Sequence, residues 1–243
     1  MNSHIFSFSG ASCSGKTTTL YQVARFLKEN DIFPGYKIEV FGEEIRDIIS
    51  QTYPGRDISI DEIRKIPGAF LSIEEKVIKR YIKRENILSY KNTIILQDRA
   101  LTDVLFYLEN YVDKTSLTED DGMLFVSLQN MLLKKLDENN YWPITVFEFT
   151  PIYKKIENDI LRPQAITSLK WYENICISRL NTYFYKNNVC KINLNTETLN
   201  DILKKISFKI RESLLCDEKL PLEIQNYEWD VKLFYSLQQS DEK

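Results

Sequence analysis

The sequence has a single histidine, His4, and its four cysteines are scattered without a Cys-x-x-Cys pair. One histidine near the start of the chain leaves almost no basis for histidine catalysis or for a histidine-based metal site. The cysteine spacing argues against both a zinc motif and a disulfide framework, and it favours a reducing compartment. Acid-base chemistry must therefore come from carboxylates.

An excess of positive charge and a long apolar run are also missing. The 32 Lys and Arg residues face 35 Asp and Glu residues, for a formal net charge of −3, so any contact with nucleic acid or an anionic membrane must come from a local patch. No apolar run approaches the roughly 18 residues of a membrane span. The first expected strand begins at His4, so we expect no signal peptide. These absences predict a cytoplasmic protein.

What the sequence does contain is a Walker A motif, Gly10 to Thr17, which fits Gly-x-x-x-x-Gly-Lys-[Ser/Thr] at every fixed position. An apolar run, His4 to Phe8, leads into it, and a helical pattern follows it. The glycines let backbone N–H groups and the helix N-terminus point at the phosphates of ATP, while Lys16 adds a charge. The predicted nucleotide-binding residues are Gly10, Ser12, Cys13, Ser14, Gly15, Lys16, Thr17 and Thr18.

A second half of the phosphate site is predicted at Asp98-Arg99, directly after the apolar strand Asn92 to Gln97. An aspartate at the end of a buried strand can hold Mg²⁺ together with the Thr17 hydroxyl, and Arg99 can reach a phosphoryl oxygen. The alternative is that Asp98 only caps the next helix.

The apolar runs alternate with helical patterns along the chain, which predicts an α/β protein. We expect the three-layer P-loop NTPase fold, a five-stranded parallel sheet with helices on both faces. Residues 1–215 would form a P-loop kinase-like domain with a lid segment at about 151–166, and residues 216–243 a C-terminal extension rich in aromatics. The expected strands are His4 to Phe8, Tyr36 to Phe41, Asn92 to Gln97, Ile144 to Phe149 and Val189 to Leu194.

The one basic cluster lies on a predicted helix from Leu71 to Tyr90, with cations from Lys76 to Arg84. Glutamates are interspersed among these cations, which favours an ordinary solvated helix face. The alternative is a contact for a phosphorylated or polymeric substrate.

Three features separate this chain from other P-loop classes. A hydrolase usually places a carboxylate beside the strand-end aspartate, whereas this chain has Arg99 there. The Asn-Lys-x-Asp signature of switch GTPases is absent from the sequence. Glu43 and Glu44 follow the second strand, where either could accept a proton from an acceptor hydroxyl. Together these features favour phosphoryl transfer to a bound small molecule.

Four motifs resemble a known family: the Walker A motif, Glu43-Glu44-Ile45-Arg46, Asp98 to Asp103, and Asp159-Ile160-Leu161-Arg162. They are similar to small P-loop ATPases and kinases typified by the ribosylnicotinamide kinase domain, a family related to deoxynucleoside and thymidylate kinases. The similarity extends over roughly residues 1 to 212. The family often has glycine where this chain has Ala100 and Ile160, so the resemblance leaves lid geometry and acceptor specificity open.

The resemblance implies a role for each matching residue. Glu43 would be the general base or hydroxyl anchor, with Glu44 as its competitor, and Arg46 would contact the acceptor. Arg99 would bind phosphate or substrate. Arg162 would be a lid arginine that neutralises charge on the transferred group; the alternative is a surface ion pair with Asp159. Lys16, Glu43, Asp98, Arg99 and Arg162 are thus the predicted catalytic residues.

The sequence therefore predicts an ATP- and Mg²⁺-dependent kinase acting on a nucleoside- or nucleotide-like small molecule. One alternative is a kinase acting on a hydroxyl of nucleic acid, with the Lys76 to Arg84 helix as its guide. Another is a nucleotide-binding regulator without transfer activity, whose C-terminal extension meets a partner. The sequence also leaves open the formation of a homo-oligomer.

Overall fold

The structure of the protein is a computed structural model. The described residues are 3–10, 14–42, 44–83, 91–99, 103–104, 107–108, 118–138, 145–150 and 189–215. Four predicted site residues, Ser12, Cys13, Glu43 and Arg162, lie outside these ranges. The predicted lid segment at about 151–166 and the C-terminal extension also lie outside them.

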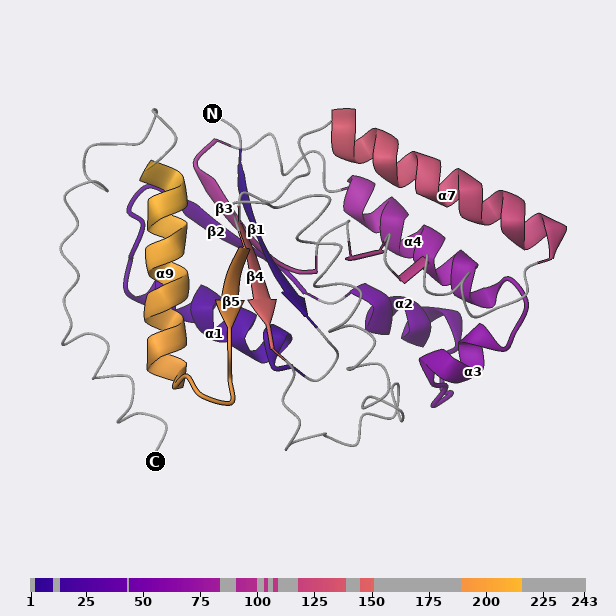
Figure 1. The fold of residues 1–243 in the computed structure, drawn as a ribbon, viewed down its shortest axis with the longest axis horizontal. Helices are drawn as coiled ribbons and strands as arrows, with labels where there is room; N and C mark the ends of the chain where they lie inside the picture. The colour runs from indigo at the N-terminus through magenta and orange to yellow at the C-terminus, as the bar shows by residue number, and fades with distance from the viewer. Residues whose placement is uncertain are drawn as a thin grey trace.

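Five strands form one parallel sheet in the order β2-β3-β1-β4-β5 (Figure 1). The strands are β1 (His4–Gly10), β2 (Lys37–Phe41), β3 (Thr93–Asp98), β4 (Thr145–Phe149) and β5 (Val189–Ile192). In the register, Phe8 lies beside Asp98 of β3, and Gly10 lies beside Phe149 of β4. This confirms the predicted α/β fold with a five-stranded parallel sheet, and it places β1 at the centre.

Six helices are described, and all follow amphipathic patterns in the sequence. They are α1 (Lys16–Glu29), α2 (Glu44–Thr52), α3 (Ile60–Arg64), α4 (Ala69–Lys83), α7 (Glu119–Glu138) and α9 (Leu199–Leu215). The helix expected from Leu71 to Tyr90 is α4; it begins two residues earlier, and its described part ends at Lys83. None of the helices in the described ranges has the length and apolarity needed to cross a bilayer.

The first apolar core lies between the sheet and helices α1 and α9. Side chains alternate along β1, so Phe6 and Phe8 enter this core while Ser7 and Ser9 face the opposite side of the sheet. The Phe8 ring lies 5.2 Å from the ring of Phe147 in β4. Buried residues of the two helices complete this core: Leu20, Val23, Leu27, Ile202, Ile206 and Ile210.

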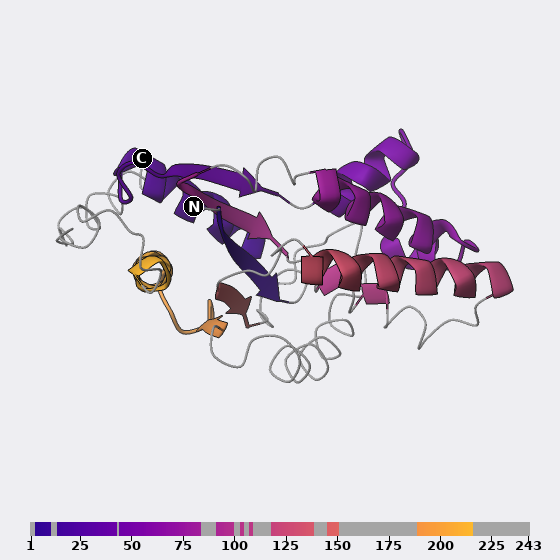
Figure 2. The same ribbon diagram turned by 90° about the horizontal axis from the view of Figure 1, so that it is seen from above.

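A second apolar core lies beyond the carboxyl ends of the strands, which point toward it in both ribbon views (Figures 1 and 2). It is built from α2, α3, α4 and α7, with buried side chains that include Ile48, Ile63, Phe70, Val77 and Leu128. Burial of each such side chain contributes about 1.5 to 3 kcal/mol to folding. The carboxyl ends of the strands thus lie between the first apolar core and the second.

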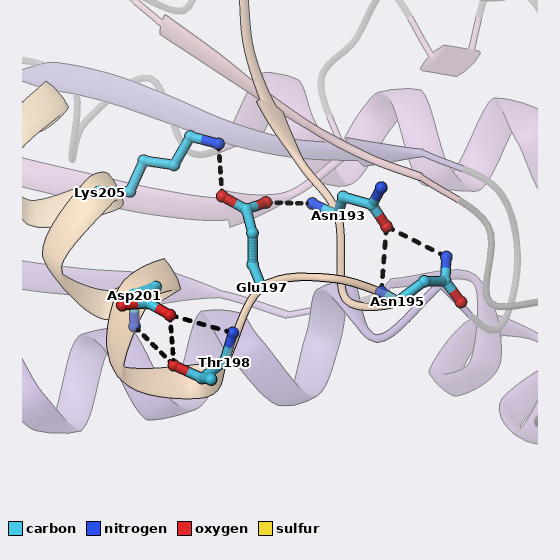
Figure 3. Close-up of polar contacts among 6 residues, drawn as sticks. All are labelled: Asn193, Asn195, Glu197, Thr198, Asp201 and Lys205. Carbon is cyan, nitrogen blue, oxygen red and sulfur yellow. Dashed lines mark hydrogen bonds and ion pairs between the residues drawn. The ribbon is translucent and has the colours of Figure 1, made fainter.

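Polar groups in the turn between β5 and α9 form hydrogen bonds with one another and with the start of α9 (Figure 3). The Glu197 carboxylate accepts hydrogen bonds from the Asn193 amide N–H, at 2.5 Å, and from Lys205 Nζ, at 2.6 Å. Thr198 caps α9: its hydroxyl accepts the Asp201 N–H at 3.2 Å and donates to the Asp201 carboxylate at 2.6 Å. These contacts hold the amino end of α9 at the same sheet edge as the Walker A motif.

Candidate nucleotide and metal site

The Walker A turn joins the end of β1 to the start of α1. Its last glycine, Gly15, has a left-handed φ of 79° and stands at the N-cap of α1, where it has no side chain to cap the first N–H groups. The first turn of α1 contains no acidic residue. The uncapped N–H groups and the positive end of the helix are therefore available to an anion.

Lys16 is the first residue of α1 and is buried, with 5% of its surface exposed. Its Nζ lies 3.5 Å from the hydroxyl of Ser14, which is also buried. A buried ammonium group is unfavourable without anionic or polar partners, and a bound phosphate would supply such partners. Thr18, by contrast, is exposed on the first turn.

Gly10 begins the turn at a position that only glycine fits. Its φ is 143°, and an added Cβ would lie 2.6 Å from the carbonyl oxygen of Phe149 in the neighbouring strand. Gly10→Ala is therefore expected to lower the free energy of unfolding by about 2 to 4 kcal/mol and to weaken nucleotide binding, because the central sheet must shift. Urea unfolding and nucleotide titration would check both effects.

Gly122→Ala is the matched control, because an added Cβ at Gly122 in α7 meets nothing within 4 Å. Alanine in a helix interior is better than glycine by roughly 0.5 to 1 kcal/mol. This variant should therefore unfold at a slightly higher urea concentration. Equal behaviour of the two variants would contradict the proposed fit at Gly10.

Thr17 and Asp98 meet between α1 and the end of β3. The Thr17 hydroxyl donates a hydrogen bond to Oδ2 of Asp98, whose side chain is buried at 1% exposure. The other carboxylate oxygen, Oδ1, is buried and has no hydrogen-bond partner among the described residues. A buried carboxylate oxygen without a partner is costly, and beside a hydroxyl it makes a pair of hard oxygens of the kind that Mg²⁺ prefers. The residues present therefore fit a magnesium ion.

Arg99 follows in a left-handed conformation, with φ of 72°. Its N–H donates to the Phe8 carbonyl at 3.0 Å, which extends the ladder between β1 and β3 by one bond. The guanidinium donates to the Tyr107 hydroxyl at 2.5 Å and to the Gly10 carbonyl at 3.5 Å, and it lies 4.9 Å from the centre of the Tyr107 ring. Arg99 is thus buried beside the first residue of the Walker A turn.

Glu44 and Arg46, two of the residues predicted to meet an acceptor, lie in the first turn of α2. The Glu44 carboxylate is held in an ion pair with Arg80 of α4 at 2.7 Å. Arg46 is exposed. The ion pair occupies Glu44, the residue that competed with Glu43 for the role of base.

A buried polar cluster lies on the sheet face opposite α1. The Ser9 hydroxyl donates to Asp103 Oδ2 at 2.7 Å, and Glu148 of β4 lies beside Ser9 in the register. Glu148 is 4% exposed, and its Oε1 has no hydrogen-bond partner among the described residues. Burial raises the pKa of Glu148, the nearby Asp103 raises it further, and Lys191 partly opposes this.

The raised pKa of Glu148 predicts a pH-dependent loss of stability. The folded protein binds this proton more tightly than the unfolded chain, whose carboxyl has its usual pKa of 4.5. Stability from this group is therefore complete below pH 4.5 and is lost as the pH rises through the folded pKa. Glu148→Gln should thus unfold at higher urea than wild type at pH 8, with the difference vanishing below pH 4.5.

Glu29→Gln serves as the control for this prediction, since Glu29 is a solvent-exposed partner of Arg25 in α1. Its effect on the free energy of unfolding should stay within about 0.5 kcal/mol at every pH. A Glu148→Gln variant that is less stable than wild type at pH 8 would contradict the assignment of Glu148 as a destabilising buried acid.

The structure brings part of the predicted site together at one sheet edge. The predicted residues found there are Gly10, Ser14, Gly15, Lys16, Thr17, Asp98 and Arg99. Sequence reasoning missed Tyr81, Tyr107, Ser9 and Glu148. For the last two a signal existed, because each is a polar residue inside an otherwise apolar strand. The two tyrosines had none, since their partners are set only by the fold.

Comparison with solved structures gives the same architecture. The crystal structure of NadR protein in complex with NR matches with a TM-score of 0.55 at 13% identity, over 87% of this chain and 51% of that chain. The complex of NadR with NAD and AMP-PNP matches with a TM-score of 0.52 at 15% identity, over 87% of this chain and 49% of that one. The chain thus spans about half the length of these structures. At this identity the likeness shows the fold.

No curated protein matches the sequence. The AAA domain family, however, matches residues 5–198, which is well over half of the chain. The matched stretch includes the Walker A motif, the Thr17 and Asp98 pair, and the whole parallel sheet up to β5. The chain therefore belongs to the AAA domain family and has a P-loop nucleotide-binding core.

Proposed function

We propose that this protein is an ATP- and Mg²⁺-dependent phosphotransferase that phosphorylates a nucleoside- or nucleotide-like small molecule. The observation that supports it most is the buried Oδ1 of Asp98, which has no hydrogen-bond partner among the described residues and belongs to the carboxylate that accepts the Thr17 hydroxyl. The NadR structures of the same fold contain NR in one case and NAD with AMP-PNP in the other.

The donor side of the site is built around negative charge. Lys16 and the N–H groups at the start of α1 would bind the β- and γ-phosphates of ATP. Thr17 and Asp98 would hold Mg²⁺, which would supply positive charge that neutralises the charge developing on the phosphates. Arg99 is buried next to Gly10, where its charge adds to that of Lys16. Because phosphoryl transfer spreads charge over oxygens, such converging cations provide most of the rate.

The acceptor would approach from the start of α2. Glu43 is our proposed base, since Glu44 is already paired with Arg80. Arg46, in the first turn of α2, would contact the acceptor, and Arg162 would supply a further cation from a lid. The base needs only to align the acceptor hydroxyl, because the transition state is loose and calls for little proton removal.

A small-molecule acceptor is favoured over nucleic acid by the contacts of the basic helix. Lys76 donates to the Thr52 hydroxyl at 2.9 Å, Lys79 to Glu75 at 2.6 Å, and Arg80 to Glu44 at 2.7 Å. These three cations of α4 are thus engaged with neighbouring side chains. They form a weaker electrostatic guide for a phosphate backbone than the sequence suggested.

The test is a panel of acceptors with ADP release as the readout. The purified protein is incubated with MgATP and each of a set of ribo- and deoxynucleosides, nucleoside monophosphates and 5′-hydroxyl oligonucleotides. Stimulation of ADP release by one small acceptor supports the proposal. Stimulation by oligonucleotides alone, falling steeply with salt, would select the nucleic-acid alternative. Tight nucleotide binding with no stimulation by any acceptor would select the regulator.

A further inference from the structure

The end of α4 reaches the sheet edge and contacts both halves of the candidate site. α4 belongs to the second apolar core, and one of its ends lies near the strand ends in both views (Figures 1 and 2). Tyr81 is buried there at 4% exposure. Its hydroxyl lies 3.2 Å from the carbonyl oxygen of Asp98 and 3.2 Å from that of Arg99.

The contact of Tyr81 falls on a strained turn. A left-handed φ such as the 72° of Arg99 is unfavourable for a residue with a side chain, by about 1 to 3 kcal/mol. It persists only where surrounding groups hold it. The bond from the Arg99 N–H to Phe8 holds one side of this turn, and the Tyr81 hydroxyl lies within hydrogen-bond distance of its two carbonyls. The conformation of this turn also sets the position of the Asp98 carboxylate, which contacts Thr17.

Arg80, the residue before Tyr81, contacts the other half of the candidate site, which lies at α2. Its Nη1 donates to Glu44 Oε2 and its Nη2 to Gln51 Oε1, both at 2.7 Å. Glu44 and Gln51 are two helical turns apart on one face of α2. A single planar guanidinium therefore fixes the direction of α2 and the start of that helix, where Arg46 lies and which Glu43 immediately precedes.

We propose that Arg80 and Tyr81 are positioning residues that form one bracket, setting the acceptor side of the site at the start of α2 relative to the metal side at the end of β3. The assignment of the two sides rests on the proposed function. Consecutive helical residues point about 100° apart, so adjacent side chains of one rigid helix can reach two different elements. Misplacement of reacting groups by about 1 Å can lower a rate by as much as 10²-fold.

The test compares Tyr81→Phe and Arg80→Met with Lys79→Met, a matched control on the same helix turn whose exposed partner is Glu75. Tyr81→Phe keeps the ring in the second core and removes only the hydroxyl. It should lower kcat about tenfold, because the metal side of the site would be held less accurately. It should also reduce, several-fold, the factor by which Mg²⁺ strengthens AMP-PNP binding.

Arg80→Met should instead raise the acceptor KM at least fivefold and leave Mg²⁺-dependent AMP-PNP binding within twofold of wild type. Arg80→Lys, which can meet Glu44 but not Glu44 and Gln51 together, should restore part of the loss. Lys79→Met should leave all of these values unchanged. The double variant Arg80→Met with Tyr81→Phe should show non-additive losses in kcat/KM, because both residues act through α4.

A purely structural role would give a different pattern. Both variants would then lower the free energy of unfolding while the kinetic constants and the Mg²⁺ effect on AMP-PNP binding stay within twofold of wild type, and the bracket would be overturned. Failure of the proposed function can be distinguished from failure of the bracket. If wild type transfers phosphate to no acceptor, a reduced Mg²⁺ effect in Tyr81→Phe still supports the contact to the metal side, and an unchanged effect overturns the bracket.

Discussion

Lys16→Ala is expected to lower acceptor-dependent ADP release at least about 10³-fold. Lys16 is buried at the start of α1 with its Nζ near the Ser14 hydroxyl, so it cannot be replaced by another mobile surface cation. Its loss removes a charge from the β- and γ-phosphates at the point where negative charge develops, and single cations in phosphoryl-transfer sites are worth about 10³ to 10⁵ in rate. Steady-state ADP release and titration with AMP-PNP would measure the losses in turnover and affinity.

The control for this experiment lies on the same helix. Lys28 is exposed in the last turn of α1, where it interacts with the helix dipole rather than with the Walker A turn. Lys28→Ala should therefore change stability by less than about 1 kcal/mol and leave turnover within twofold. A Lys16→Ala protein that keeps a tenth of wild-type turnover, or a Lys28→Ala protein that loses it, would count against the assigned phosphate site.

The sheet could be predicted because its strands are short runs rich in apolar residues, and the three central strands are buried along their whole length. All five expected strands are found, with differences of a few residues at their ends. The strands that precede the Walker A motif and Asp98-Arg99 could be recognised in the sequence for the same reason. A parallel sheet brings all carboxyl ends to one edge, so Gly10 and Asp98 had to lie near each other once their strands were assigned. The contact of Asp98 with Thr17 follows from this geometry.

The second apolar core could not be predicted, because periodicity shows that a helix has an apolar face without showing what covers it. Tyr81 illustrates the limit. Tyr81 is one of the apolar residues of an amphipathic helix, and it is buried in this core. Its hydroxyl, however, has partners at the end of β3 that depend on how α4 meets the sheet edge. Arg80 likewise pairs with Glu44 of α2, whereas the sequence suggested that glutamates of its own helix would balance the cations.

Polar residues within the strands are the signal that sequence analysis underused. Ser7 and Ser9 alternate with Phe6 and Phe8 along β1, a pattern that indicates two buried faces of different chemistry. The polar face contains the hydrogen bond from Gln97 Nε2 to the Ser7 hydroxyl at 3.0 Å. Most buried polar groups in proteins have hydrogen-bond partners, so polar residues at alternate positions of a buried strand predict a buried hydrogen-bond network on that face of the sheet.

Asp98→Asn is expected to separate activity from stability. Asparagine has nearly the same shape as aspartate and can still accept the Thr17 hydrogen bond, but it removes the negative charge that would hold Mg²⁺. Activity at saturating MgATP should fall at least about 10²-fold, since the metal supplies several kcal/mol of charge stabilisation. The free energy of unfolding should stay equal or rise, because a neutral group replaces a buried carboxylate whose Oδ1 has no hydrogen-bond partner within the described part of the chain.

The opposite signs of these two effects make the experiment decisive. An aspartate that only caps a helix would keep both its activity and its stability on this change, because asparagine caps a helix about as well as aspartate does. Thr17→Val should behave like Asp98→Asn in its dependence on Mg²⁺ concentration, whereas Thr18→Val, at the exposed neighbouring position, should resemble wild type. If Asp98→Asn were fully active, the metal assignment would fail. Asp98 Oδ1, which has no hydrogen-bond partner among the described residues, would then have to be balanced by a group other than a divalent cation.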